Sequence, residues 1–164
     1  MALQVQVLGV EELQSNLQQY GAQMESEIVS AVRLTSQIVR SNAVRSIQKK
    51  SSGGRTYQKY NPRRTHEASP PGMPPNTDTG RLAGSIRVAS YGTMADVGTD
   101  LDYGKFLELG TQEMSARPYM VPALEQARPG WNKRLAEMSS RAASKVDVKT
   151  PSMWGRIAGW FKRS

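Results

Sequence analysis

The sequence LQVQVLGVEELQSNLQQYGAQMESEIVSAVRLTSQI, residues 3–38, contains the change of hydrophobic period that decides the fold class. Residues Leu3–Leu8 alternate apolar and polar side chains, as a half-buried strand does. From Val10 onward, apolar side chains recur at spacings of three and four, which is typical of an amphipathic helix. A strand followed directly by a long helix predicts a fold that contains both kinds of element.

The helical pattern can continue to about Lys49, and its length bears on assembly. A helix from Val10 to Lys49 would measure roughly 60 Å at about 1.5 Å per residue, longer than a domain of this size can cover. We therefore predict that part of it packs against another chain. The alternative is two shorter helices that break near Gly21, because an interior glycine costs a helix about 1 kcal/mol relative to alanine. The single helix is the preferred prediction.

Residues 50–77 combine prolines, glycines and basic side chains without either regular period, which predicts a long loop or arm. Loops of this length usually serve binding or are disordered. No acidic residue occurs between Ile28 and His66, so positive charge is concentrated here. One reading is contact with phosphates through charge and base stacking, and the other is a solvated loop against an acidic protein surface. The candidate interaction residues of the arm are Arg55, Tyr57, Lys59, Tyr60, Arg63 and Arg64.

A hairpin is predicted after the arm. Residues 77–82 are expected to begin a short helical turn with a Thr or Asp side chain as its cap. Ile86–Tyr91 and Met94–Thr99 are then expected to pair as strands around a turn at Gly92. Together with Leu3–Leu8 they would form one small sheet.

Two helices are predicted in the last part of the domain. Tyr103–Leu109 carries apolar side chains at helical spacing and is followed by Gly110, a residue type that ends helices. A longer helix begins near Val121, and Pro129 is expected to kink it. The predicted fold class is therefore α+β, with a small antiparallel sheet packed against a long N-terminal helix and a C-terminal helix.

Residues 1–145 are predicted to form a single domain, since a chain of 164 residues is sized for one core. Residues 146–164 are predicted to be an amphipathic tail that buries its apolar side against a neighbouring subunit. The alternative is a tail that lies on a membrane surface, as basic helices with tryptophan do. The candidate interface residues of the tail are Trp154, Ile157, Trp160 and Phe161.

The composition excludes several kinds of active site. The chain has no cysteine, which removes thiolate nucleophiles and Cys-based metal sites, and it has one histidine, His66, which falls in the predicted loop. No nucleophile motif, phosphate-binding loop or metal-binding helix motif occurs. We therefore expect no catalytic residue, no metal and no cofactor. The net charge of +8 favours an acidic partner.

Four segments in this order resemble the head–tail joining proteins of long-tailed phages, also called neck, minor tail or tail-completion proteins. The segments are SGGRTY at 52–57, HEASPPGMPPNTDTGRLAGSI at 66–86, YGKFLELGT at 103–111 and ARPYMVPAL at 116–124. The residues of these segments that we expect to have structural roles are Thr79, Gly80, Arg81, Leu82, Tyr103, Glu108, Gly110, Thr111, Arg117, Pro118 and Pro122.

The resemblance implies a non-enzymatic virion protein, assembled in the host cytoplasm. It implies a homo-oligomeric ring around the DNA channel, a hexamer in preference to a dodecamer, between connector and tail rings. No membrane partner is expected. The alternative within this class is a tail terminator or assembly factor that caps the tail tube. The alternative of another class is a basic nucleic-acid-binding accessory protein.

Overall fold

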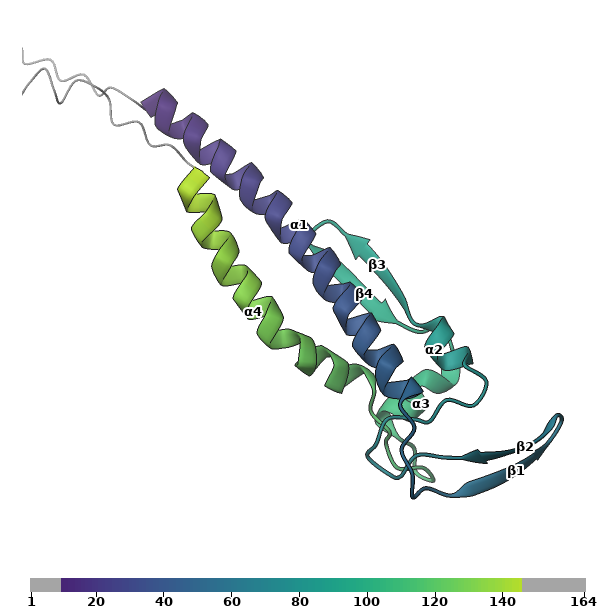
Figure 1. The fold of residues 1–164 in the computed structure, drawn as a ribbon. Coiled ribbons are helices and arrows are strands. Elements are labelled where there is room, and N and C mark those ends of the chain that lie inside the picture. The colour runs from purple at the N-terminus through teal and green to yellow at the C-terminus, as the bar shows by residue number, and fades with distance from the viewer. Residues whose placement is uncertain (1–9, 146–164) are drawn as a thin grey trace, which may run out of the picture. The chain divides into compact units, whose positions relative to one another are not determined.

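A computed structural model describes residues 10–145, which form an α+β fold of four helices and two separate antiparallel hairpins within that range (Figure 1). The predicted strand Leu3–Leu8 and the predicted tail at 146–164 lie outside the described residues. In chain order the elements are α1 Val10–Gln48, β1 Thr56–Tyr60, β2 Arg63–Glu67, α2 Arg81–Ser85, β3 Arg87–Tyr91, β4 Met94–Gly98, α3 Asp102–Leu109 and α4 Met120–Lys145.

The chain divides into two compact units, and α1 and α4 contribute to both. The terminal unit contains residues 10–28 of α1 and residues 136–145 of α4. The central unit, residues 29–135, contains the rest of both helices together with both hairpins, α2 and α3. The resemblance motifs all fall in the central unit.

The prediction of a single long N-terminal helix is confirmed, since α1 runs unbroken from Val10 to Gln48. A break near Gly21 is wrong: a methyl group added at Gly21 would meet nothing within 4 Å, so the glycine weakens the helix without redirecting it. Glu11 and Glu12 in the first turn and Arg45 in the last turn also suit the helix dipole.

The prediction that the arm has no regular structure is wrong, because ten of its residues form the β1–β2 hairpin. Most side chains on both faces of this hairpin are exposed, so the apolar alternation that usually reveals a strand is missing. Tyr57 pairs with His66 and Lys59 pairs with Arg64 across the strands. The turn between β1 and β2 consists of Asn61 and Pro62, which are joined by a cis peptide bond.

The second hairpin agrees with its prediction. Strands β3 and β4 pair from Arg87 with Gly98 to Tyr91 with Met94, and Gly92 in the turn has a φ of 58°. Among the described residues no third strand joins this pair. The preceding residue, Ile86, ends α2 and is almost fully buried.

The predicted cap of α2 is wrong. The residue before the helix is Gly80, whose φ of 78° is a conformation that favours glycine, and no side chain caps the helix. The Asp78 carboxylate instead binds side chains of the β1–β2 hairpin. Asp78 therefore resembles a helix cap in the sequence, whereas in the structure it contacts residues of the hairpin that are far from it along the chain.

The core of the central unit lies where α1, α2 and α4 meet. Small side chains such as Ala43, Ala83 and Ala123 let the helices approach closely, and the aromatic ring of Tyr119 fills the space near them. A hydrogen bond of 2.8 Å from Arg40 Nε of α1 to the Ile86 carbonyl links two of these elements. The buried cluster consists of Val39, Ala43, Ile47, Leu82, Ala83, Ile86, Tyr119, Ala123 and Ala127.

Candidate functional site

The basic face of the β1–β2 hairpin converges on one carboxylate. Residues 57, 59, 64 and 66 lie on the same face, because neighbouring positions alternate between faces and the two strands pair in register. Asp78 accepts hydrogen bonds from Lys59 Nζ, from Arg64 Nε at 3.0 Å and from Arg64 Nη2 at 3.2 Å. His66 Nδ1 lies 3.8 Å from the same carboxylate. Asp78 thus fastens the hairpin to the segment that precedes α2.

The electrostatics of Asp78 follow from this geometry. Hydrogen bonds from Arg64 and then from Lys59 lower the pKa of the Asp78 carboxyl to about 2. The carboxylate is therefore ionised under all ordinary conditions. Its single negative charge is shared between two cations, so the hairpin keeps a positive excess.

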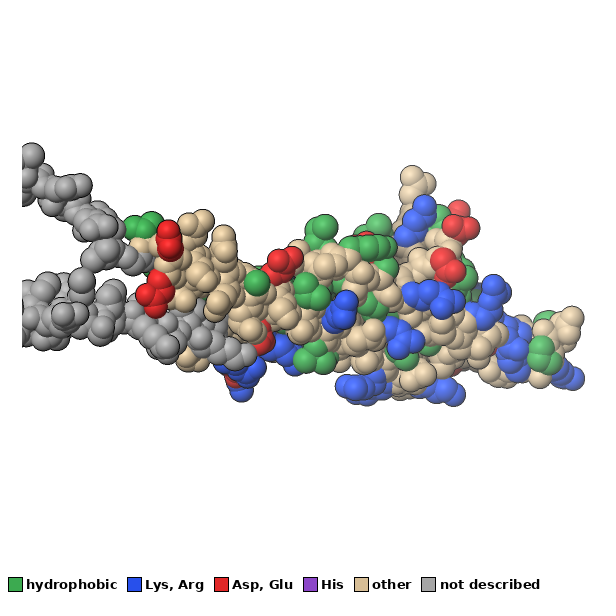
Figure 2. Space-filling view, turned by 90° about the horizontal axis from the view of Figure 1, so that it is seen from above, with side chains coloured by type: hydrophobic (Ala, Val, Ile, Leu, Met, Phe, Trp, Pro, Cys, Tyr) green, Lys and Arg blue, Asp and Glu red, His purple; other side chains and the backbone are tan. Residues whose placement is uncertain are grey.

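The six candidate residues of the arm do not form one surface. Lys59 and Arg64 are held at Asp78, whereas Tyr60 and Arg63 pair next to the turn on the opposite face. Tyr60 is 80% exposed. The Arg55 guanidinium carbon lies 5.3 Å from the centre of the Tyr57 ring, within the range of a cation–π contact. Lys and Arg side chains gather over this part of the chain (Figure 2).

The prediction that His66 falls in a loop is wrong. His66 lies on β2, and its side chain is only 19% exposed. It borders a cavity of about 290 Å³ that we name the Arg117 pocket. Three of the four resemblance segments meet there, since the lining includes His66, residues 75–82, Tyr103 and Arg117.

The Arg117 pocket contains an arginine that the sequence did not mark as a binding residue. Arg117 Nε is buried without a hydrogen-bond partner in the described part of the chain. Arg81 also lines the pocket and is exposed. From the sequence, Arg81 and Arg117 were predicted to have structural roles only. The segments that carry them are separated along the chain and meet only after folding.

Three of the motif residues, Glu108, Gly110 and Thr111, make contacts at the end of α3 and the start of α4. The Glu108 carboxylate accepts hydrogen bonds of 2.8–2.9 Å from the backbone N–H groups of Tyr119, Met120 and Val121 at the start of α4. Gly110 ends α3 with a φ of 78°. Thr111 Oγ1 accepts hydrogen bonds from the backbone N–H groups of Glu113, at 3.2 Å, and Met114, at 3.1 Å. Glu108 therefore caps α4 as well as belonging to α3.

Pro118 and Pro122 flank the first residues of α4. Pro118 precedes α4, and Pro122 falls in its first turn, where a backbone N–H would have no helical partner. Pro129 lies inside α4.

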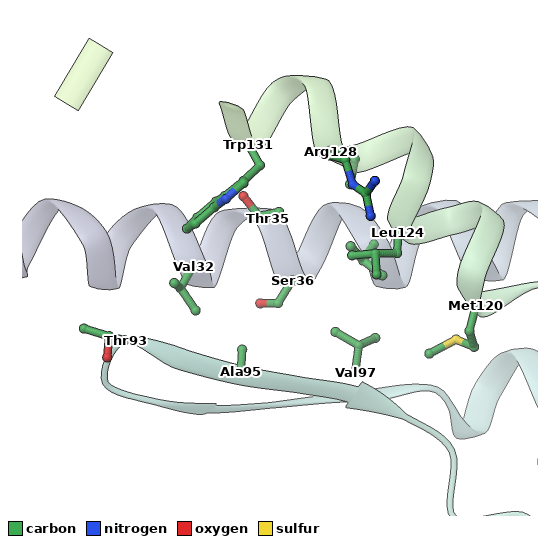
Figure 3. A pocket seen from close by; sticks show the side chains of 12 residues that line it. Val32, Thr35, Ser36, Thr93, Ala95, Val97, Met120, Leu124, Arg128 and Trp131 are labelled. Carbon is green, nitrogen blue, oxygen red and sulfur yellow. The ribbon is translucent and has the colours of Figure 1, made fainter. Parts of the chain in front are cut away.

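An apolar groove of about 450 Å³ opens between α1, α4 and β4 in the central unit (Figure 3). The large apolar side chains that line it are Val32 and Val39 of α1, Val97 of β4, and Met120, Leu124 and Trp131 of α4. In Figure 3, Val32 and Ser36 extend from α1 toward β4, and Thr35 extends toward Trp131. The groove is open in the single chain.

The groove contains one unsatisfied polar atom. Thr35 Oγ1 is buried and makes no hydrogen bond within residues 10–145. The adjacent Ser36 hydroxyl donates to the Arg33 carbonyl at 2.9 Å. A group that entered the groove with a donor or acceptor could satisfy Thr35.

Among the described residues, no group of three or more His, Asp or Glu side chains is placed to hold a metal ion. Within the same range, no helix combines the length and hydropathy needed to cross a membrane. The candidate tail residues, Trp154, Ile157, Trp160 and Phe161, lie outside the described residues. Comparisons with protein-family models, with curated proteins and with solved structures found no match for this chain.

Proposed function

We propose that this chain is a structural subunit of a phage neck, forming a homo-oligomeric ring that joins head to tail around the DNA channel. The observation that carries the proposal is the open apolar groove between α1, α4 and β4. The four sequence segments that resemble head–tail joining proteins support the proposal that the particle is a long-tailed phage. The groove supports assembly with other protein chains.

Assembly is favoured by the apolar surface that the central unit exposes. Tyr91 and Met94, next to the β3–β4 turn, are 61% and 70% exposed, and Leu124 beside the groove is 49% exposed. Contiguous apolar surface on a soluble domain usually marks a contact with protein or membrane. Trp131, Met120 and Arg128 at the groove are of the residue types that protein interfaces favour.

A ring requires a particular kind of contact. In a cyclic assembly with more than two subunits, each neighbour contributes a different surface, so the groove of one subunit must receive another part of the next. We propose the exposed β3–β4 turn or the predicted apolar tail as the part that enters the groove. The exposed Tyr60 and Arg63 of the β1–β2 hairpin are suited to contact with an adjacent ring.

The purified full-length chain tests the proposal by size-exclusion chromatography with light scattering. We expect one discrete oligomer larger than a dimer, either alone or after the neighbouring connector protein is added. A tail terminator would instead bind the end of tail tubes without remaining in the joint, which electron microscopy of tubes and of whole particles with the labelled protein would distinguish.

A second candidate function, nucleic-acid binding, is favoured by the charge of the central unit. Residues 29–135 carry sixteen Lys and Arg side chains and eight Asp and Glu side chains. Binding through phosphates weakens steeply as salt rises. A strictly monomeric protein with tight, salt-sensitive DNA binding would favour this function over the ring.

A further inference from the structure

The Arg117 pocket has a charge that the protein itself does not balance. Arg117 Nε is buried without a partner, and neither Arg117 nor Arg81 forms an ion pair within residues 10–145. A buried donor on a charged group is costly when no acceptor meets it. An acceptor that enters the cavity would remove this cost.

The one carboxylate that lines the pocket is already engaged. Asp78 accepts hydrogen bonds from Lys59 and Arg64 and lies 3.8 Å from His66 Nδ1. It therefore supplies little negative charge to Arg117 or Arg81. The pocket and the cations beside it keep a positive excess, which selects an anion as the ligand.

The number and type of donors indicate which anion. Thr77, Thr79 and Tyr103 line the same cavity, and their hydroxyls make no hydrogen bond within the described part of the chain. With two guanidinium groups, these donors exceed what the two oxygens of a carboxylate can use, whereas a phosphate group presents three or four oxygens. We propose that the Arg117 pocket binds a phosphate group, either free phosphate or the phosphate of a nucleic acid.

The burial of Arg117 Nε limits the form of the ligand. Free phosphate or a terminal phosphate can enter a cavity of about 290 Å³, whereas an internal phosphodiester of duplex DNA brings a sugar on each side. We therefore expect free phosphate or a 5′-terminal phosphate to bind more tightly than the internal backbone. The Arg117 pocket shares no lining residue with the apolar groove, so its phosphate binding can be tested separately from ring assembly.

Isothermal titration of the full-length chain with inorganic phosphate, in a buffer free of phosphate and sulfate, tests the site. We expect saturable binding that R117Q and R81Q each weaken about tenfold or more, because each removes hydrogen bonds to a charged group. R87Q is the matched control. It removes the same charge from an exposed residue of β3 that does not line the pocket. The R87Q variant should bind inorganic phosphate with the affinity of the wild type.

The variant at Arg81 keeps the test decisive if R117Q fails to fold, since Arg81 is exposed and its side chain makes no hydrogen bond within the described chain. Wild type that shows no saturation overturns the proposal. Equal weakening by R81Q and R87Q also overturns it, because the binding would then reflect net charge alone. Competition by acetate as effective as that by phosphate would indicate a carboxylate site and overturn the assignment.

Competition between inorganic phosphate and oligonucleotides identifies the source of the phosphate. An oligonucleotide with a 5′-phosphate that displaces inorganic phosphate, while the same strand without it does not, supports a nucleic-acid end as the ligand. If neither strand competes, saturable binding of inorganic phosphate supports free phosphate as the ligand.

Discussion

The Glu108 carboxylate accepts a 2.8 Å hydrogen bond from the backbone N–H of Tyr119 and so joins the end of α3 to the start of α4. The same carboxylate receives the N–H groups of Met120 and Val121, both at 2.9 Å. Three backbone donors at a helix start would otherwise need other partners. One side chain on α3 therefore fixes where α4 begins.

Glu108→Ala should lower the free energy of unfolding by about 2 kcal/mol, because it removes a charged cap from three N–H groups. Glu108→Gln should lower it less, since the amide keeps one oxygen acceptor. Urea denaturation followed by circular dichroism measures both. Glu113→Ala is the control, because the Glu113 side chain is exposed and makes no hydrogen bond in residues 10–145. Equal losses for E108A and E113A would contradict the capping role.

Stability at high pH should depend on Tyr119. Burial, followed by the Glu108 and Tyr103 charges, raises the pKa of the Tyr119 hydroxyl from 10.0 to about 12. Because folding favours the protonated form, the contribution is complete below pH 10 and is lost as pH rises through about 12. The phenolate absorbance of the folded protein should therefore include one tyrosine that ionises late.

Tyr119→Phe should remove that late transition and part of the stability loss at high pH. Tyr91→Phe, at a 61% exposed position, should leave both unchanged. An unchanged late transition in Y119F would show that another tyrosine is responsible.

The hairpin anchor at Asp78 gives the opposite dependence on pH. Hydrogen bonds from Arg64 and Lys59 lower the pKa of Asp78 from 3.8 to about 2, so the anchor is complete above about pH 4 and is lost as pH falls through about 2. At pH 7, Asp78→Asn should speed hydrogen exchange of the β1 and β2 amides. Near pH 2 the variant and the wild type should converge.

Asp96→Asn on β4 removes the same charge at an exposed position, and it should leave hairpin exchange unchanged. If D78N exchanged as slowly as D96N at pH 7, the ion pairs at Asp78 would not hold the hairpin.

The long helices could be predicted from the sequence because each repeats its apolar pattern over many turns. Leu13 and Leu17, or Leu124 and Ala127, recur at helical spacing regardless of what surrounds them. The β3–β4 hairpin was also predictable, since Gly92 marks its turn between two short strands.

The arm and its anchor were not predictable in this way. The β1–β2 hairpin has polar side chains on both faces, so no period of two separates an inner face from an outer one. Asp78 stands next to the start of α2, as a capping residue does, but its partners, Lys59 and Arg64, lie 19 and 14 residues earlier. The contacts of Asp78 with Lys59 and Arg64 form only when folding brings these distant segments together, so no local sequence pattern predicts them.

The same reason explains the Arg117 pocket. Its arginines belong to segments that look structural one at a time, and Arg117 does donate its backbone N–H to the Leu107 carbonyl at 2.7 Å. The unpaired guanidinium becomes apparent only when residues 75–82, Tyr103 and Arg117 surround one cavity.

Two glycines within helices should respond oppositely to alanine. Gly21 in α1 has open space around it, so Gly21→Ala should raise the free energy of unfolding by about 0.5–1 kcal/mol. At Gly104 in α3, the added methyl carbon would lie 2.5 Å from Thr99 Cγ2 and 3.1 Å from Tyr119 Oη. Gly104→Ala should therefore lower the free energy of unfolding by about 1–3 kcal/mol. Thermal denaturation of both variants checks the two signs.

Assembly through the apolar groove can be separated from folding with two leucines of equal exposure. Leu124 lines the groove and Leu34 does not, yet each is 49% exposed. Leu124→Lys should place a charge where a partner is expected to pack, and desolvating that charge would oppose association. Leu34→Lys makes the same chemical change on α1 away from the groove.

We expect L124K to shift the light-scattering mass toward the monomer, whereas L34K should keep the wild-type oligomer. Both variants should retain the wild-type unfolding transition when measured as monomers, since partly exposed positions tolerate lysine by extending its amine into water. If L124K assembles as the wild type does, the groove is not the subunit contact, and the exposed turn at Tyr91 and Met94 becomes the surface to vary. A loss of assembly in both variants would indicate that added positive charge alone prevents association, because the chain already carries a net charge of +8.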